Sequence, residues 1–347
     1  MTKLYSPSGR GDWQRVSADE AGWSPEGLQV ALDVGRDELS SGLVVLWRGR
    51  ILAEGYWTLP DELPELFPGG VEIFRAMQLG KTADGYPIED VASTQKSLTA
   101  LLVLMAARRG LLRLDDPVKA HLGAGWSTAS SGREAGITVR HLLEMTSGLG
   151  EELDYQRPAG EFWKYNAAAY HRLLPLVEAA AGKPINDLTS DWLTSPLGMS
   201  DTRWIDRKFI HPGAPLGLAT TTRDLARFGL LILAQGSWRE SLQLAETEDI
   251  AELVRPSQTL NPSYGLLWWL NGQSSYTRPL GGDPLAGPLF TSAPADLVAA
   301  MGTFQRRVYV VPSLDLVVAR MGYTKVLPSG PFDEVLWAAL SAAAPGR

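Results

Sequence analysis

The chain has 347 residues, of which 45% are hydrophobic, and this is enough apolar material for one large domain or two lobes. Its net charge of −7 and its lack of lysine- or arginine-rich runs argue against nucleic acid or an anionic membrane as a partner. It has no cysteine, which excludes disulfides, thiolate nucleophiles and cysteine-ligated zinc.

Two further observations bear on location and cofactors. Segment 1–10 lacks the apolar core of a signal peptide, and no segment approaches the ~18 apolar residues of a membrane span, so we expect a cytoplasmic protein. The four histidines are scattered without metal-ligand spacing, and we expect neither a metal nor an organic cofactor; these histidines are His121, His141, His171 and His211.

The N-terminal part of the chain predicts a helix followed by a hairpin. Residues 21–35 have the apolar spacing of an amphipathic helix, and residues 42–57 read as two strands that turn at 48–50. A stretch rich in proline and glycine follows at 59–89, with one short helical candidate at 71–79. Its length is typical of a loop or of a lid over a site.

The middle of the chain predicts helices and the end predicts strands. The helical candidates are 93–109, 138–145, 167–181, 185–193 and 222–234. The strand candidates are 263–270, 297–301, 307–311 and 314–321, and a closing helix follows at 332–343. We expect strands from both chain ends to join in one sheet, with a helical lobe inserted between them. The expected parts are 1–92 and 236–347, which form the α/β lobe, and 93–235, the mainly helical lobe.

One tetrapeptide combines a nucleophile with a base. Ser93 and Lys96 open the apolar run 97–107, and on a helix a spacing of three places both side chains on one face. Serine needs a base, and burial at the positive end of a helix favours a neutral lysine. Taken alone, the tetrapeptide is weak evidence, because chance matches are common and a helix cap followed by a solvated lysine explains it better.

A tyrosine further along the chain fits the same chemistry. Tyr165 follows a loop-like entry at 158–164 and precedes a helix. A phenol both donates and accepts a hydrogen bond, so it can relay a proton between a nucleophile and a leaving group. A tyrosine in isolation is more often a packing residue.

With Ser93, Lys96 and Tyr165 in this order, the chain resembles the serine β-lactamase-like superfamily, which includes class C β-lactamases, DD-peptidases, family VIII carboxylesterases and 6-aminohexanoate-dimer hydrolases. The resemblance covers nearly the whole chain, and the other matching segments are 110–118, 137–149, 196–202, 217–229 and 264–269. It implies an α+β fold of the β-lactamase/DD-peptidase type, with an antiparallel sheet flanked by helices and an inserted all-helical lobe.

The resemblance also implies roles for individual residues. Ser93 would be the nucleophile, Lys96 its base and Tyr165 the proton shuttle. The backbone N–H groups of Ser93 and Thr303 would form the oxyanion hole. Four further residues are candidates for substrate binding, and these are Asn166, Trp163, Gly302 and Arg306. For Trp163, core packing is the alternative.

Two departures from the family pattern narrow the expected activity. Penicillin-recognising members carry Lys-Thr-Gly on the strand that corresponds to 300–307, and this chain has no such tripeptide; Arg306 or Arg307 could take the place of the lysine. The family's Tyr-x-Asn becomes Tyr165-Asn166-Ala167, so the amide has moved.

Both departures favour an esterase or amidase over an antibiotic hydrolase. We therefore expect a serine hydrolase acting on a small ester or amide, with that molecule as its partner. Two alternatives remain open: a catalytically silent binding protein on the same fold, and a weak β-lactamase or DD-peptidase. The sequence does not indicate an oligomeric state.

Overall fold

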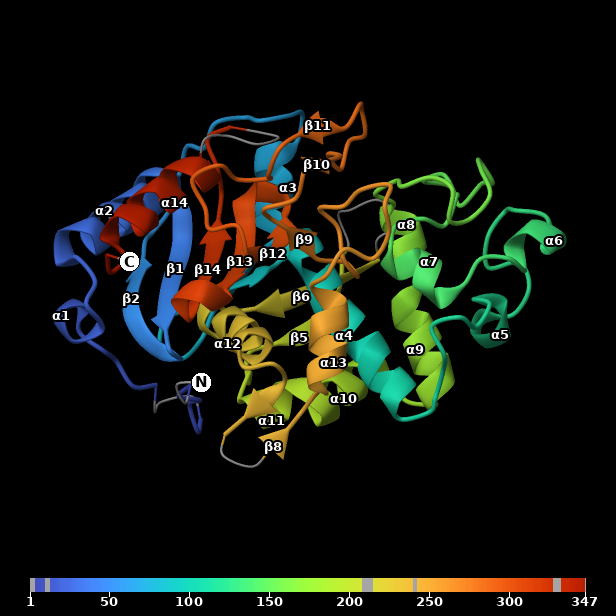
Figure 1. Ribbon diagram of the computed structural model, residues 1–347, viewed down its shortest axis with the longest axis horizontal. Coiled ribbons are helices and arrows are strands. Elements are labelled where there is room, and N and C mark those ends of the chain that lie inside the picture. The colour runs from blue at the N-terminus through green and yellow to red at the C-terminus, as the bar shows by residue number, and fades with distance from the viewer. Residues whose placement is uncertain (1–3, 10–12, 208–214, 240–241, 327–331, 347) are drawn as a thin grey trace.

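A computed structural model gives the structure of the protein and describes residues 4–9, 13–207, 215–239, 242–326 and 332–346. The elements form two lobes, one built around a large sheet and the other mainly from helices (Figure 1). Both ends of the chain lie in the lobe that contains the large sheet.

The large sheet has six antiparallel strands in the order β2-β1-β14-β13-β12-β9. Strand β1 from the N-terminal part pairs with β14 from the C-terminal part, which confirms that strands from both chain ends join in one sheet. The strands are β1 (Ser40–Trp47), β2 (Arg50–Tyr56), β9 (Trp269–Leu270), β12 (Val298–Gly302), β13 (Arg306–Val311) and β14 (Leu316–Gly322).

Helices cover both faces of this sheet. Helix α2 approaches β1 closely at Gly35, where an added Cβ would lie 2.9 Å from the Leu43 side chain. Helix α12 approaches β14 at Gly229, where an added Cβ would lie 2.6 Å from Val317. Leu43 pairs with Arg320, three positions from Val317, so the two helices cover opposite faces. Helix α14 packs beside α2; the bounds are α2 (Pro25–Asp37), α12 (Thr222–Leu233) and α14 (Phe332–Ala343).

Local signals in the sequence set the ends of several helices. The Ser24 hydroxyl accepts from the Gly27 N–H at 3.0 Å and caps α2, and the Thr221 hydroxyl accepts from the Asp224 N–H at 3.2 Å and caps α12. Helix α9 ends at Gly182, whose φ of 63° suits glycine in the left-handed region.

The second lobe surrounds helix α4. All residues from Gln95 to Ala106 of this helix are buried, as expected for an element that is packed on every side. The lobe contains α4 (Gln95–Arg108), α5 (Lys119–Leu122), α6 (Ser131–Glu134), α7 (Val139–Leu143), α8 (Ala167–Tyr170), α9 (Leu173–Ala181), α10 (Ile185–Thr189), a π-helical turn (Ser190–Thr194) and α11 (Ser195–Leu197). None of the helices in the described ranges is long and apolar enough to cross a bilayer.

A second sheet contains strands that the sequence did not predict. It has four short antiparallel strands in the order β3-β4-β6-β5, and two of them fall within 93–235. The expectation of an all-helical lobe is therefore corrected, because strands of four or five residues leave little local signal and the β4–β6 pair joins segments more than 100 residues apart. The strands are β3 (Gln78–Lys81), β4 (Pro87–Asp90), β5 (Arg203–Asp206) and β6 (Leu216–Thr220).

The fold class is confirmed as α+β, with an antiparallel sheet flanked by helices. The predicted strand 263–270 shrinks to β9, because Leu267 adopts a φ of 59° and turns the chain before Trp269. Helix α12, expected in the helical lobe, covers the six-stranded sheet, while the division at residues 92 and 235 stays a prediction. The remaining elements are α1 (Ala18–Ala21), α3 (Gly70–Ala76), α13 (Thr247–Leu253), β7 (Ser237–Trp238), β8 (Leu242–Gln243), β10 (Ser275–Tyr276) and β11 (Leu285–Ala286).

Candidate active site

The candidate nucleophile and base meet at the start of α4. Ser93 lies in a short 3₁₀ turn (Ala92–Thr94) that leads directly into the helix, so Ser93 and Lys96 share one face. The Lys96 Nζ donates a hydrogen bond to the Ser93 Oγ at 2.9 Å. Ser93 is half-buried, whereas Lys96 is only 5% exposed.

The residue before the nucleophile adopts an unusual backbone conformation. Ala92 has a φ of 52°, a region that costs a non-glycine residue free energy of order 1–3 kcal/mol. The Asp90 carboxylate accepts from the Ala92 N–H at 2.8 Å and holds this conformation. The turn that presents Ser93 is therefore held by hydrogen bonding and not by the intrinsic backbone preference of alanine.

Lys96 lies in surroundings that favour its neutral form. Burial, with a smaller contribution from the nearby Arg207 cation and an opposing one from Glu151, lowers its pKa from 10.5 to about 7. The Nζ lies over two phenol rings, 4.9 Å from the Tyr165 centroid and 4.5 Å from the Tyr170 centroid, and these contacts favour the ammonium form and oppose the effect of burial. A large fraction of Lys96 is thus neutral near pH 7 and able to accept a proton.

Tyr165 completes the group. Burial raises the pKa of its phenol to about 12, and the interaction with the Ser93 side chain opposes this shift. The ring stacks on Trp269 with centroids 6.2 Å apart. Tyr165 is consequently a neutral phenol near pH 7, which suits a proton relay better than a phenolate base. The structure brings together all three residues that the sequence singled out for chemistry.

A buried ion pair between Arg207 and Asp90, next to the start of α4, was not predicted from the sequence. Arg207 binds Asp90 with two hydrogen bonds of 2.6 Å each and donates a third to the Gln95 side chain at 3.0 Å. Gln95 also accepts from the Leu218 N–H at 2.9 Å, which ties the start of α4 to β6. Asp90 and Arg207 are 117 positions apart, so no local pattern in the sequence connects them.

The end of β12 lies against the serine turn. Gly302 is buried, and an added Cβ would lie 2.6 Å from the Val91 carbonyl oxygen and 2.7 Å from the Thr94 hydroxyl. Gly302 therefore permits close approach of two backbones and offers no side chain for substrate. Thr303 follows it and is exposed. Its N–H as the second oxyanion donor stays a prediction, and this close approach of the two segments supports it.

A second apolar cluster fixes both of these segments. Ala92 and Phe304, each with a positive φ, pack together with Tyr323 and with Phe74 and other residues of the 59–77 region. The Phe304 ring centroid lies 5.5 Å from that of Phe74 and 4.9 Å from that of Tyr323. The stretch that the sequence left as a loop or lid thus packs behind Ser93 and β12.

Two of the expected substrate-binding residues face the interior instead. Arg306 is fully buried and donates to the Glu89 carboxylate at 2.9 Å, so it cannot reach a substrate. Asn166 caps α8: its amide donates to the carbonyls of Leu149 and Gly150, and its oxygen accepts from the Ala169 N–H. Both predictions are corrected, because each side chain satisfies a buried backbone or carboxylate that would otherwise lack a partner.

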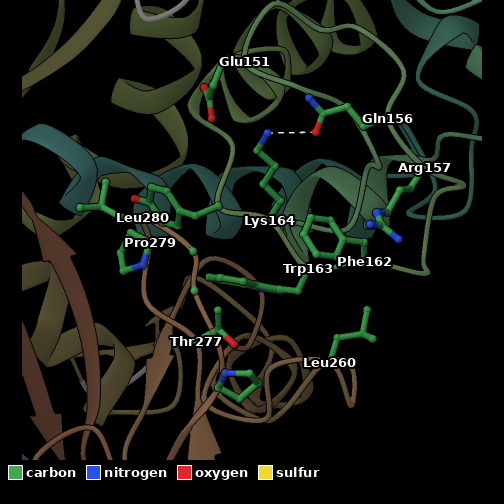
Figure 2. A pocket seen from close by; sticks show the side chains of 14 residues that line it. Glu151, Gln156, Arg157, Phe162, Trp163, Lys164, Leu260, Thr277, Pro279 and Leu280 are labelled. Carbon is green, nitrogen blue, oxygen red and sulfur yellow. Dashed lines mark hydrogen bonds between the residues drawn. The ribbon is translucent and has the colours of Figure 1, made fainter.

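Trp163, the fourth expected substrate-binding residue, lines a pocket of about 590 Å³ next to the site (Figure 2). Tyr165 lines the same pocket, which opens between the segment 151–165 and the segment 260–284. On its inner side Trp163 packs edge-on against Tyr264 and Trp269. Both the pocket role and the packing role considered for this residue are therefore compatible with its position.

The described residues offer no cluster of three or more histidine or acidic side chains that could hold a metal ion. Of the histidines, His171 is buried near Lys96, where burial and the neighbouring cations lower its pKa strongly, and His211 lies outside the described residues. The candidate reactive groups that the site brings together are the hydroxyl of Ser93, the amine of Lys96 and the phenol of Tyr165.

Comparison with known proteins shows the family of the chain. The model of the family described as Beta-lactamase matches residues 48–343, and the chain belongs to that family. Its curated relatives include the Beta-lactamase-like protein str5 of Strobilurus tenacellus, 35% identical over 89 residues, and the Esterase EstB of Burkholderia gladioli, 29% identical over 170 residues. The matches cover 24% and 38% of this chain and only 31% and 43% of those relatives.

Solved structures match along most of their length. The fold is similar to that of a Beta-lactamase/D-alanine carboxypeptidase from Yersinia pestis, with a TM-score of 0.61 at 18% identity, covering 91% of this chain and 97% of that one. It is also similar to a Bacillus anthracis protein assigned as a 6-aminohexanoate-dimer hydrolase, with a TM-score of 0.65 at 15% identity, covering 98% and 87%. At these identities the likeness establishes the fold.

Proposed function

We propose that the protein is a serine hydrolase that cleaves a small ester or amide through an acyl-enzyme on Ser93. The observation that carries the proposal is the 2.9 Å hydrogen bond from the buried Lys96 Nζ to the Ser93 Oγ. An amine whose pKa lies near 7 at hydrogen-bond distance from a hydroxyl is the pair that activated-serine chemistry requires.

The reaction follows from the positions of these groups. Neutral Lys96 takes the proton of Ser93 as Oγ adds to the substrate carbonyl, and the backbone N–H groups of Ser93 and Thr303 are proposed to stabilise the oxyanion. Collapse breaks the bond to the leaving group, which receives the proton from Lys96 by way of Tyr165. Water then adds to the acyl-enzyme and loses its proton to the same pair. That proton passes to the Ser93 Oγ as the acyl–oxygen bond breaks, which frees the acid and regenerates Ser93 and neutral Lys96.

The surroundings favour an ordinary ester or amide over a β-lactam. The chain lacks Lys-Thr-Gly, and the two arginines that follow β12 do not replace its lysine, because Arg306 pairs with Glu89 and Arg307 pairs with Asp333 in the interior. The curated relative named Esterase EstB supports the same direction.

The test is turnover of p-nitrophenyl esters of graded acyl length, together with labelling by a serine-reactive phosphonate. Wild-type protein should hydrolyse the esters and gain one label on Ser93 by mass spectrometry, and Ser93→Ala should abolish both. Ser131→Ala, at an exposed serine of α6, is the matched control and should behave as wild type. Hydrolysis that survives Ser93→Ala would remove Ser93 as nucleophile. The absence of turnover and of label in wild type would favour the silent binding protein.

A further inference from the structure

The pocket beside Tyr165 gathers exposed apolar side chains. Among the described residues, seven large apolar side chains are exposed, and three of these line this one pocket: Phe162 at 39%, Leu260 at 39% and Leu280 at 87% exposure. Exposed apolar groups that cluster around a concave site indicate a binding surface, whereas single ones scattered over a protein need no explanation.

The pocket has two unlike walls. Leu260, Pro279 and Leu280 supply a mainly apolar wall from the 260–284 segment (Figure 2). The facing wall, from the segment 151–165, carries polar groups beside Phe162 and Trp163: the Lys164 Nζ donates to the Gln156 side chain at 3.0 Å, and Glu151 lies nearby. A ligand with an apolar body and a small polar substituent fits both walls.

Tyr165 links this pocket to the reacting atoms. It interacts with the Ser93 side chain, its ring lies 4.9 Å from the Lys96 Nζ, and it also lines the pocket, whereas Ser93 itself does not line it. In the proposed reaction the leaving group takes its proton through Tyr165, so the leaving oxygen or nitrogen must lie within hydrogen-bond distance of that phenol. The part of the substrate attached to this atom then extends past Tyr165 into the pocket.

We propose that this pocket binds the leaving group of the substrate, an alcohol or amine with a bulky apolar body. The inference rests on the proposed function and goes beyond it by assigning the two halves of the substrate to different places. The volume of about 590 Å³ lies within the range of pockets that hold drug-sized ligands, so the pocket has room for a leaving group far larger than methanol or ammonia.

The assignment separates acylation from deacylation. The leaving group is present only until the acyl-enzyme forms, so the pocket can affect acylation and product binding but not hydrolysis of the acyl-enzyme. A pocket for the acyl group would have the opposite signature, because that group stays on Ser93 until the last step.

The test compares phenyl acetate with 2-naphthyl acetate, whose alcohols have similar acidity and whose acyl-enzymes are identical. Wild type should have a kcat/KM about tenfold higher for the naphthyl ester, the effect of one well-filled apolar pocket. The double variant Leu260→Ala/Leu280→Ala should lose this preference, while the acetyl-enzyme hydrolyses at the wild-type rate with both esters. Leu242→Ala, at a leucine of similar exposure (40%) on β8, is the control and should keep the preference.

Two outcomes would overturn the proposal: a double variant that keeps the naphthyl preference, or one that changes the rate of deacylation. A binding measurement separates this failure from failure of the proposed function. The Ser93→Ala variant should bind 2-naphthol, and quenching of its tryptophan fluorescence measures the binding. Adding Leu260→Ala/Leu280→Ala to this variant should weaken the binding about tenfold. If naphthol binds but no ester is hydrolysed by wild type, the hydrolase proposal fails and the pocket remains; if esters are hydrolysed but naphthol does not bind, the pocket assignment fails.

Discussion

The two sides of Ser93 are built in different ways. On the inner side, Glu89 and Asp90 are buried and paired with Arg306 and Arg207, and the aromatic cluster around Phe304 packs behind them. On the pocket side, the segments 151–165 and 260–284 leave apolar side chains exposed around an open space.

This difference separates reactivity from selectivity. The acidic residues on the inner side are paired with arginines and the aromatic rings are packed together, so the serine turn and the end of β12 are held in place before a substrate arrives. The groups on the pocket side have few such restraints, and they can change without disturbing the turn. Substitutions on the inner side should therefore alter rate and stability, and substitutions on the pocket side should alter the choice of substrate.

The largest expected effect comes from removing the base. Lys96→Met should lower kcat/KM for every ester by about 10²–10⁴-fold, the contribution typical of a positioned proton acceptor. It should also raise the melting temperature, because it replaces a buried amine by an apolar side chain of similar length. Steady-state kinetics and thermal unfolding measure the two effects. Lys119→Met, at an exposed lysine of α5, should change neither, and a Lys96→Met enzyme with wild-type rate would exclude Lys96 as the base.

Breaking a buried ion pair on the inner side should lower the free energy of unfolding by nearly as much as removal of the base raises the activation free energy. Arg306→Met leaves the Glu89 carboxylate, only 1% exposed, without its cation, and should lower the free energy of unfolding by about 3–5 kcal/mol. Urea unfolding followed by fluorescence measures it. Adding Glu89→Gln should recover part of the loss, because an amide is easier to bury unpaired than a carboxylate. A loss below about 1 kcal/mol would mean that the pair is solvated and the inner side is not rigid.

A smaller effect is expected from pH alone. The kcat/KM for a neutral ester should rise with pH and reach half of its plateau near pH 7, because Lys96 becomes an acceptor as it loses its proton. Tyr165, whose pKa is raised to about 12, should add no second ionisation between pH 6 and 10. A profile that falls through pH 7 would require a protonated Lys96 and contradict the mechanism.

Stability should follow the same group with a defined sign. Since the pKa of Lys96 is lower in the folded than in the unfolded chain, the unfolded state binds more protons between about pH 7 and 10.5, and this contribution to stability rises with pH over that window. Lys96→Met removes the contribution, so a comparison of the two proteins across this range isolates it.

The sequence predicted the parts of this site that depend on local pattern. The hairpin at 42–57, the start of α4 and the closing helix at 332–343 were predicted close to their observed bounds, because their periodicity and turn residues are contained in one segment. Ser93 and Lys96 share a face for the same local reason.

The sequence could not predict what depends on distant partners. Asn166 looked like a displaced substrate ligand, yet it caps α8 and holds two carbonyls of a loop 16 and 17 residues earlier in the chain. Arg306 looked available on an edge strand, yet it meets Glu89, 217 positions away. Arg207 carried no recognisable motif. Pairings of this kind are set by how distant segments pack against one another, which leaves no periodic signal in either segment.

The smallest effect is expected from a substitution on the pocket side, and it tests the difference between the two sides of Ser93 most directly. Phe162→Ala removes a ring that is 39% exposed and contacts Arg157 at 5.1 Å, so the free energy of unfolding should change by less than about 0.5 kcal/mol. Phe74→Ala makes the same substitution at a fully buried ring of the cluster behind Ser93 and should cost about 3–5 kcal/mol. Urea unfolding of both variants gives the contrast in one experiment. If Phe162→Ala proved as costly as Phe74→Ala, the pocket side would be as tightly packed as the inner side, and its exposed side chains would belong to the core rather than to a binding surface.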